Sequence, residues 1–133
     1  MKRLLLALAL CLGSPALAQP VGPQFIGCNK TAIVSAAAAT TKIVTEVAGL
    51  AVHICGYDVG AGAAAGGFQL ISGTGATCGT GTVNITAAYT LAINAFAASR
   101  SGYVQYSTNP AQAICAITTG TGPTALTLYY GQY

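Results

Sequence analysis

Residues 51–59 read A-V-H-I-C-G-Y-D-V, and this stretch decides the fold class. Its branched and aromatic residues favour a β-strand, in which successive side chains point to opposite faces. Val52 and Ile54 share one face of the predicted strand, whereas His53 and Tyr57 lie on the other, together with the cysteine between them. Because this second face is also partly apolar, we expect the strand to be covered on both sides.

Short apolar runs of the same kind recur along the rest of the chain. Glycine, threonine, serine and asparagine separate them, and the longest interruptions are the glycine-rich stretches 60–67 and 73–81. Many short strands with turn residues between them are typical of an all-β sandwich or barrel. We therefore predict a β-sandwich of jelly-roll type with about eight or nine short antiparallel strands. The predicted strands are 32–36, 42–47, 51–59, 67–72, 83–86, 89–94, 102–107, 113–118 and 125–130.

Alternation within the predicted strand 42–47 assigns its two faces. Lys42, Val44 and Glu46 fall on one face, and the opposite charges of Lys42 and Glu46 mark that face as the one in contact with solvent. Opposite charges on one strand face are also expected to form a weak surface ion pair.

Residues 1–18 have the pattern of a secretory signal peptide. The chain starts with M-K-R, an apolar run follows, and the small-residue cleavage signature A-L-A ends the segment. We predict cleavage after residue 18, an extended lead-in over 19–30 and a single β-sandwich domain over 31–133. No later apolar run has the length of a membrane helix. We therefore expect a secreted or periplasmic bacterial protein that makes no membrane contact after cleavage.

Charged residues are scarce, with five Lys and Arg and two Asp and Glu in 133 residues. A protein that follows a phosphate backbone needs more cations, so nucleic acid is not an expected partner. A near-neutral β surface is prone to self-association, which makes copies of the chain itself an expected partner. Outside the predicted signal peptide the charged residues are Lys30, Lys42, Glu46, Asp58 and Arg100.

Four cysteines follow the predicted signal peptide, namely Cys28, Cys55, Cys78 and Cys115. In an oxidising compartment they are expected to form two disulfides. Four cysteines allow three pairings, and their spacing alone does not choose among them. The chain has no C-x-x-C pair, and its single histidine, His53, lies two residues from Cys55 on a predicted strand, which speaks against zinc. We expect no metal and no other cofactor.

The candidate catalytic residues are few. His53 and Asp58 invite comparison with a Ser–His–Asp triad, but the G-x-S-x-G nucleophile motif is absent from the sequence. Glu46 and Asp58 are the only acidic residues, and a glycosidase needs two carboxyl groups placed across a cleft. We therefore expect no enzyme and no catalytic residues. A hydrolase that uses His53 and Asp58 is the third hypothesis, after the two given at the end of this section.

Three motifs follow one another along the chain: K-I-V-T-E-V-A-G-L-A-V-H-I-C-G-Y (42–57), F-Q-L-I-S-G-T-G-A-T-C-G-T-G (68–81) and N-P-A-Q-A-I-C-A-I (109–117). With the tyrosine-rich strand at the end, they resemble a family of small, mostly uncharacterised β-sandwich proteins of phage and prophage-bearing bacterial genomes. The resemblance extends over residues 28–133. It implies a jelly-roll-like fold, a virion-associated or tail-associated role in some relatives, and no catalytic residues to carry over. The signal peptide would place this chain in an exported, cysteine-containing branch.

The jelly-roll expectation also selects a disulfide pairing. In a jelly roll the third and eighth strands are antiparallel neighbours in one sheet. Cys55 lies late in the third predicted strand and Cys115 early in the eighth, and an antiparallel pair brings such positions together. We therefore predict the bridges Cys55–Cys115 and Cys28–Cys78.

The function that we expect is that of a non-enzymatic, exported structural or interaction protein. Its partners would be copies of itself or another surface or virion protein. The alternative is a glycan-binding β-sandwich module, in which tyrosines supply the stacking platform and Asn and Gln supply hydrogen bonds. Tyrosine is favoured at interfaces because it combines apolar area with a polar tip. The candidate docking surface consists of Tyr103, Tyr106, Tyr129 and Tyr130.

Overall fold

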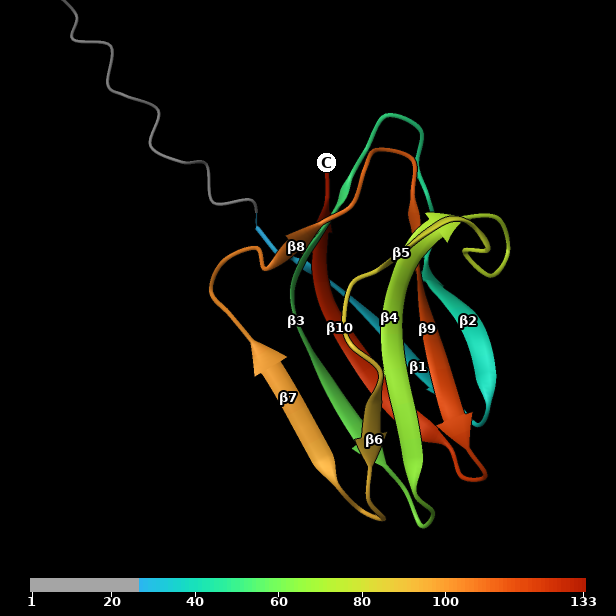
Figure 1. Cartoon of the computed structure of the whole chain (residues 1–133). Helices are drawn as coiled ribbons and strands as arrows, with labels where there is room; N and C mark the ends of the chain where they lie inside the picture. The colour runs from blue at the N-terminus through green and yellow to red at the C-terminus, as the bar shows by residue number, and fades with distance from the viewer. Residues whose placement is uncertain (1–26) are drawn as a thin grey trace, which may run out of the picture.

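The computed structural model describes residues 27–133 (Figure 1). The predicted signal peptide and most of the predicted lead-in lie outside the described residues. Within the described range the chain is all-β, and it contains no helix that is long and apolar enough to cross a bilayer. The strands are β1 (Lys30–Ala36), β2 (Ala39–Val44), β3 (Val52–Ala61), β4 (Gly66–Thr74), β5 (Thr80–Asn84), β6 (Tyr89–Leu91), β7 (Phe96–Arg100), β8 (Tyr106–Ser107), β9 (Ala113–Gly120) and β10 (Thr124–Gln132).

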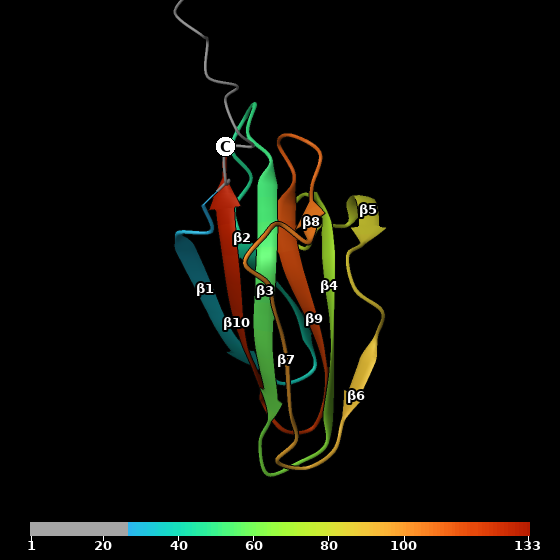
Figure 2. The same cartoon turned by 90° about the vertical axis from the view of Figure 1, so that its left-hand side faces the viewer.

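The strands form two antiparallel sheets that pack as a β-sandwich. Sheet A has the order β1-β10-β3-β7, and the short β8 pairs with β3 beside β7. Sheet B has the order β2-β9-β4-β5, and β6 also pairs with β4. Figure 2 shows β1, β10 and β3 of sheet A side by side. The chain changes sheet between β1 and β2, between β2 and β3, and between β3 and β4, so β1 faces β2 and β3 faces β4 across the core.

The hydrophobic core lies between the two sheets. Its side chains are aliphatic with one phenylalanine, and each fully buried Val, Leu, Ile or Phe stabilises the fold by about 2 kcal/mol relative to an exposed position. Both sheets contribute their inward-facing residues, as alternation requires. The buried core residues are Val44, Val52, Ile54, Val59, Ala61, Phe68, Leu70, Leu91, Ile114, Ala116, Leu126 and Leu128.

A β-bulge at Cys55 changes the alternation of β3. Tyr129 of β10 pairs with Gly56, and the next residue, Tyr130, pairs with Ile54, so Cys55 is the extra residue of β3. Before the bulge Ile54 faces the core, and after it Tyr57 packs against the same core. The prediction that Tyr57 shares the face of His53 is therefore wrong, because strict alternation does not continue through a bulge.

A second irregularity affects β2. The register between β2 and β9 shifts between Lys42 and Val44, and β2 ends at Val44. Val44 is only 3% exposed and belongs to the core, so its predicted place on the solvent face is wrong. The predicted surface ion pair is confirmed, since Lys42 Nζ lies 2.7 Å from Glu46 Oε2.

The strand predictions are least accurate between residues 89 and 107. The predicted strand 89–94 is reduced to β6, and the predicted strand 102–107 is reduced to the two residues of β8. Between them lies β7, whose sequence F-A-A-S-R contains no β-branched residue and was not predicted. Register with β3, rather than local propensity, makes this segment a strand.

The two disulfides differ from the predicted pairing. Cys28 is bonded to Cys55, with their Cα atoms 6.1 Å apart, and Cys78 to Cys115, with their Cα atoms 6.0 Å apart. The prediction of Cys55–Cys115 and Cys28–Cys78 is therefore wrong. Cys115 lies on β9 in sheet B, whereas β3 lies in sheet A, where its neighbours are β10 on one side and β7 and β8 on the other. The predicted pairing placed the strand of Cys115 beside β3.

Candidate functional site

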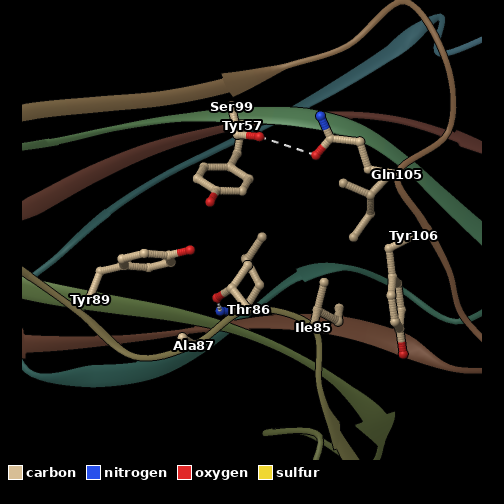
Figure 3. A pocket seen from close by; sticks show the side chains of 10 residues that line it. Tyr57, Ile85, Thr86, Ala87, Tyr89, Ser99, Gln105 and Tyr106 are labelled. Atoms are coloured by element: carbon tan, nitrogen blue, oxygen red, sulfur yellow. Dashed lines mark hydrogen bonds between the residues drawn. The ribbon is translucent and has the colours of Figure 1, made fainter.

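A cavity of about 320 Å³ opens between the sheets where β7 and β8 face the segment between β5 and β6. Its walls come from β3, β4, β8 and the segments 85–89 and 99–105 (Figure 3). Backbone hydrogen bonds from Ile85 and Thr86 to the carbonyl oxygen of Leu70, 2.9 and 3.2 Å long, hold one wall in place. The lining residues are Ile54, Tyr57, Leu70, Ile85, Thr86, Ala87, Tyr89, Ser99, Gln105 and Tyr106.

The rings of Tyr57 and Tyr89 line this cavity, and both pack against Phe68, which is not part of its lining. The ring of Phe68 lies 5.1 Å from that of Tyr57 and stacks on Tyr89 at 5.3 Å with an interplanar angle of 14°. Tyr57 faces inward because of the bulge at Cys55, and Gly56 allows close approach to β7, where a Cβ atom would lie 2.3 Å from the Ser99 carbonyl oxygen. A second cavity of about 280 Å³ adjoins the first and shares Tyr57, Tyr89 and Ser99 with it.

Hydroxyl and amide groups supply the polar part of the cavity. Figure 3 shows the hydroxyls of Tyr57 and Tyr89 directed toward the same space. The Ser99 hydroxyl donates to Gln105 Oε1 over 3.2 Å, which leaves the amide NH₂ of Gln105 as a donor. The Thr86 hydroxyl accepts a hydrogen bond of 3.0 Å from the backbone N–H of Leu70.

The cavity is electrically neutral at physiological pH, because its lining residues are aliphatic, aromatic, hydroxyl or amide side chains. Burial raises the pKa of Tyr57 to about 12, and the neighbouring Tyr89 adds to this rise. Desolvation disfavours the phenolate, so Tyr57 stays protonated and can donate a hydrogen bond. The site is therefore suited to binding an uncharged molecule rather than to acid–base chemistry.

A charged cluster lies elsewhere, on the outer face of sheet A. Arg100 Nε donates to Asp58 Oδ1 over 2.8 Å, and its terminal nitrogen bonds the other oxygen. The Tyr129 hydroxyl also donates to Asp58 Oδ2, over 2.8 Å, and the Arg100 guanidinium lies 4.9 Å above the Tyr129 ring. The hydrogen bond from Arg100 holds the pKa of Asp58 below its ordinary value, and the bond to Asp58 raises the pKa of Tyr129.

The candidate catalytic residues do not come together. His53 Nδ1 lies 2.8 Å from the Ser107 hydroxyl oxygen, its cross-strand neighbour, whereas Asp58 bonds Arg100 and Tyr129. Five residues of strand separate His53 from Asp58, which is roughly 16 Å. Glu46 pairs with Lys42 beside sheet B, so the two carboxylates do not face one another across a cleft.

The four tyrosines of the predicted docking surface occupy separate places. Tyr103 is 70% exposed in the segment between β7 and β8, and Tyr106 lines the cavity. Tyr129 belongs to the outer charged cluster, whereas Tyr130 packs against the core. Tyr57, which the predicted surface did not include, joins the cavity to the core. The sequence signal of the bulge that turns it inward is Gly56, a glycine inside a strand pattern.

Comparisons with known protein families, with curated proteins and with solved structures found no significant match. Among the described residues no group of three or more His, Cys, Asp or Glu side chains is placed to hold a metal ion.

Proposed function

We propose that this protein is a non-enzymatic, exported structural or interaction protein that associates with copies of itself. The observation that carries the proposal is the outer face of sheet A. Ile33 on β1 and Phe96 on β7 are 76% and 67% exposed, and β1 and β7 are the two opposite edge strands of this sheet. Large apolar side chains exposed to this degree on a single face are typical of interaction surfaces.

In the row of Phe96 the central positions of this face carry small residues. Gly60 pairs with both Ala125 and Phe96, and Ala98 lies one step further along β7 on the same face. In the row of Ile33 the central positions are Thr127 and Asp58. A two-fold axis through the centre would place Ile33 of one copy over Phe96 of the other, which is the self-complementary arrangement that a symmetric dimer requires.

The charges of this face are internally compensated. Asp58 is neutralised by Arg100, whose guanidinium lies over the Tyr129 ring, and the Tyr129 hydroxyl donates to the same carboxylate. Packing a second copy against a compensated pair costs less than burying an unpaired charge. The same engagement of Asp58 supports a non-catalytic role, because its carboxylate is held by two donors rather than directed at a substrate.

The jelly-roll type is part of this proposal, and the strand order supports it. The first and last strands are neighbours in sheet A, β3 follows β10, and sheet B repeats the arrangement with β2, β9 and β4. The motif resemblance to phage-associated β-sandwich proteins supports another surface or virion protein as a further partner. Two disulfides are compatible with an oxidising, exported environment, and export itself remains part of the proposal.

The oligomeric state of the secreted chain tests the proposal. Light scattering after size-exclusion chromatography should show a dimer or larger assembly for the wild type and a monomer for the double variant Ile33→Ser, Phe96→Ser. Val83→Ser is the matched control, because Val83 is an exposed branched residue on β5 of sheet B, and it should assemble like the wild type. A monomeric wild type at all concentrations would contradict self-assembly.

A glycan-binding module is the second candidate function. The observation that favours it is the neutral cavity, where Tyr57 and Tyr89 offer both ring surface and hydroxyl groups. Binding sites commonly combine such aromatic walls with a few convergent polar groups. Binding of the secreted chain on a glycan array, retained in the double variant Ile33→Ser, Phe96→Ser, would support this function independently of assembly.

A further inference from the structure

We propose that the cavity between β3 and the segment 85–89 binds a single uncharged pyranose ring, with Tyr57 and Gln105 as its hydrogen-bond donors. The proposal rests on the second candidate function and identifies its site, ligand class and polar contacts. The first support is size. The volume of about 320 Å³ lies within the range of small-molecule sites, roughly 300–1,000 Å³.

The second support is the combination of apolar and polar surface. Tyr57 and Tyr89 supply the aromatic wall of the cavity, and the buried Phe68 ring packs against both of them from behind. A pyranose ring has a face of C–H groups that suits such a wall and a rim of hydroxyls that needs hydrogen bonds. The Tyr57 hydroxyl and the Gln105 amide NH₂ lie on the cavity wall, and the Ser99 bond orients that amide.

The same groups disfavour other classes of ligand. A purely apolar ligand would remove the hydroxyls of Tyr57 and Tyr89 from water without offering them a partner, which costs about 1–3 kcal/mol for each unsatisfied group. A charged ligand would meet no counter-charge, because the lining contains no ionised side chain and the Asp58–Arg100 pair is on the outer face of sheet A. An uncharged molecule with many hydroxyl groups fits both conditions.

The adjoining cavity of about 280 Å³ extends the site. It shares Tyr57, Tyr89 and Ser99 with the first and continues past Phe68 to Ala97. Tyr57 and Tyr89 therefore stand between two compartments of similar size. A second pyranose unit of a short oligosaccharide would fit there, so a disaccharide should bind more tightly than its single unit.

Saturation-transfer NMR with a panel of methyl pyranosides of glucose, galactose and mannose tests the proposal. At least one should bind the wild type, with ring protons saturated and with shifts in the Gln105 side-chain NH₂. Tyr57→Phe, which keeps the ring and removes one hydroxyl, should weaken binding about tenfold, as expected for the loss of one hydrogen bond. Tyr129→Phe is the matched control, because it removes a tyrosine hydroxyl from the outer face instead.

Gln105→Ala is the second variant, and it should also weaken binding. It keeps the proposal testable if Tyr57→Phe does not fold. Binding by none of the panel at about 50 mM, or equal binding by wild type, Tyr57→Phe and Gln105→Ala, would overturn the proposal. The measurements are repeated on the double variant Ile33→Ser, Phe96→Ser. Binding by a monomer would show that the cavity acts without assembly, and assembly without binding would reject the cavity proposal alone.

Discussion

The two outer faces of the sandwich differ in what covers them. On sheet B the loop between β4 and β5 folds over the sheet, and the Cys78–Cys115 bridge holds it there. Ile71 and Ala113 are buried beneath this loop. On sheet A the outer face has no comparable cover among the described residues, and Ile33 and Phe96 remain exposed. The chain therefore covers one apolar outer face itself and leaves large apolar side chains exposed on the other, where we propose that a second copy binds.

The two disulfides follow the same division. Cys78 and Cys115 are completely buried and form a small core of their own on sheet B. Cys28 and Cys55 border a shallow cavity of about 240 Å³ beside Arg100, on the side of sheet A. The first bridge thus fixes a covering loop, whereas the second ties the start of β1 to the bulge of β3.

Removing the bridges one at a time should have the largest effect on stability. The chain-entropy model assigns each bridge about 4 kcal/mol, because their sequence separations of 37 and 27 residues differ little. Cys78→Ala with Cys115→Ala should cost more than Cys28→Ala with Cys55→Ala, because it also uncovers Ile71. Urea unfolding of the two double variants measures the difference. A larger loss for the Cys28–Cys55 bridge would contradict the role assigned to the covering loop.

A smaller effect is expected where the covering loop touches β4. A Cβ atom on Gly73 would lie 2.5 Å from the Cys78 carbonyl oxygen, so Gly73→Ala should force the loop away and cost about 1–3 kcal/mol. Gly79→Ala is the control within the same loop, since its Cβ would meet nothing closer than 3.6 Å. Its free energy of unfolding should stay within about 0.5 kcal/mol of the wild type. An equal loss of unfolding free energy in both variants would show that the loop does not pack closely against Gly73.

The smallest effect concerns the ion pairs of the two faces. Asp58 and Glu46 both have lowered pKa values, so each stabilises the fold above its unfolded pKa and loses that contribution as the pH falls through its folded pKa. The free energy of unfolding should therefore fall between about pH 5 and pH 2. Asp58→Asn should flatten this dependence more than Glu46→Gln, because Asp58 has both Arg100 and Tyr129 as partners. Urea unfolding at several pH values measures how strongly the free energy of unfolding depends on pH in each variant. A larger flattening by Glu46→Gln than by Asp58→Asn would contradict this prediction.

The sequence predicted the fold class, most strand positions and the Lys42–Glu46 pair, because these depend on local propensity and on the alternation of side chains. It did not predict the bulges at Cys55 and after Lys42, which arise from pairing with β10 and β9. The misplaced faces of Tyr57 and Val44 both follow from these bulges. The disulfide pairing failed for a related reason, since it depends on which strand lies beside β3.

The sequence did not predict the cavity, because its walls also depend on a bulge and on strand pairing. Tyr57 lines it only because the bulge turns the second half of β3 inward, and β7, which brings Ser99 to the wall, was not predicted as a strand. Tyrosine content alone pointed to Tyr129 and Tyr130, which neighbour each other in sequence but face opposite sides of sheet A. Residues that are brought together by strand register and bulges can be recognised only once the sheet is assembled.

Sedimentation velocity of one charge variant on each outer face tests the central claim most directly. Ala125→Glu on β10 places a carboxylate in the row of Gly60 and Phe96 on sheet A, whereas Thr119→Glu on β9 places it on the outer face of sheet B, at the same end of the sandwich. Both positions are exposed, so both variants should fold. The account predicts that Ala125→Glu sediments as a monomer and that Thr119→Glu assembles like the wild type. Assembly that survives Ala125→Glu and is lost in Thr119→Glu would contradict it.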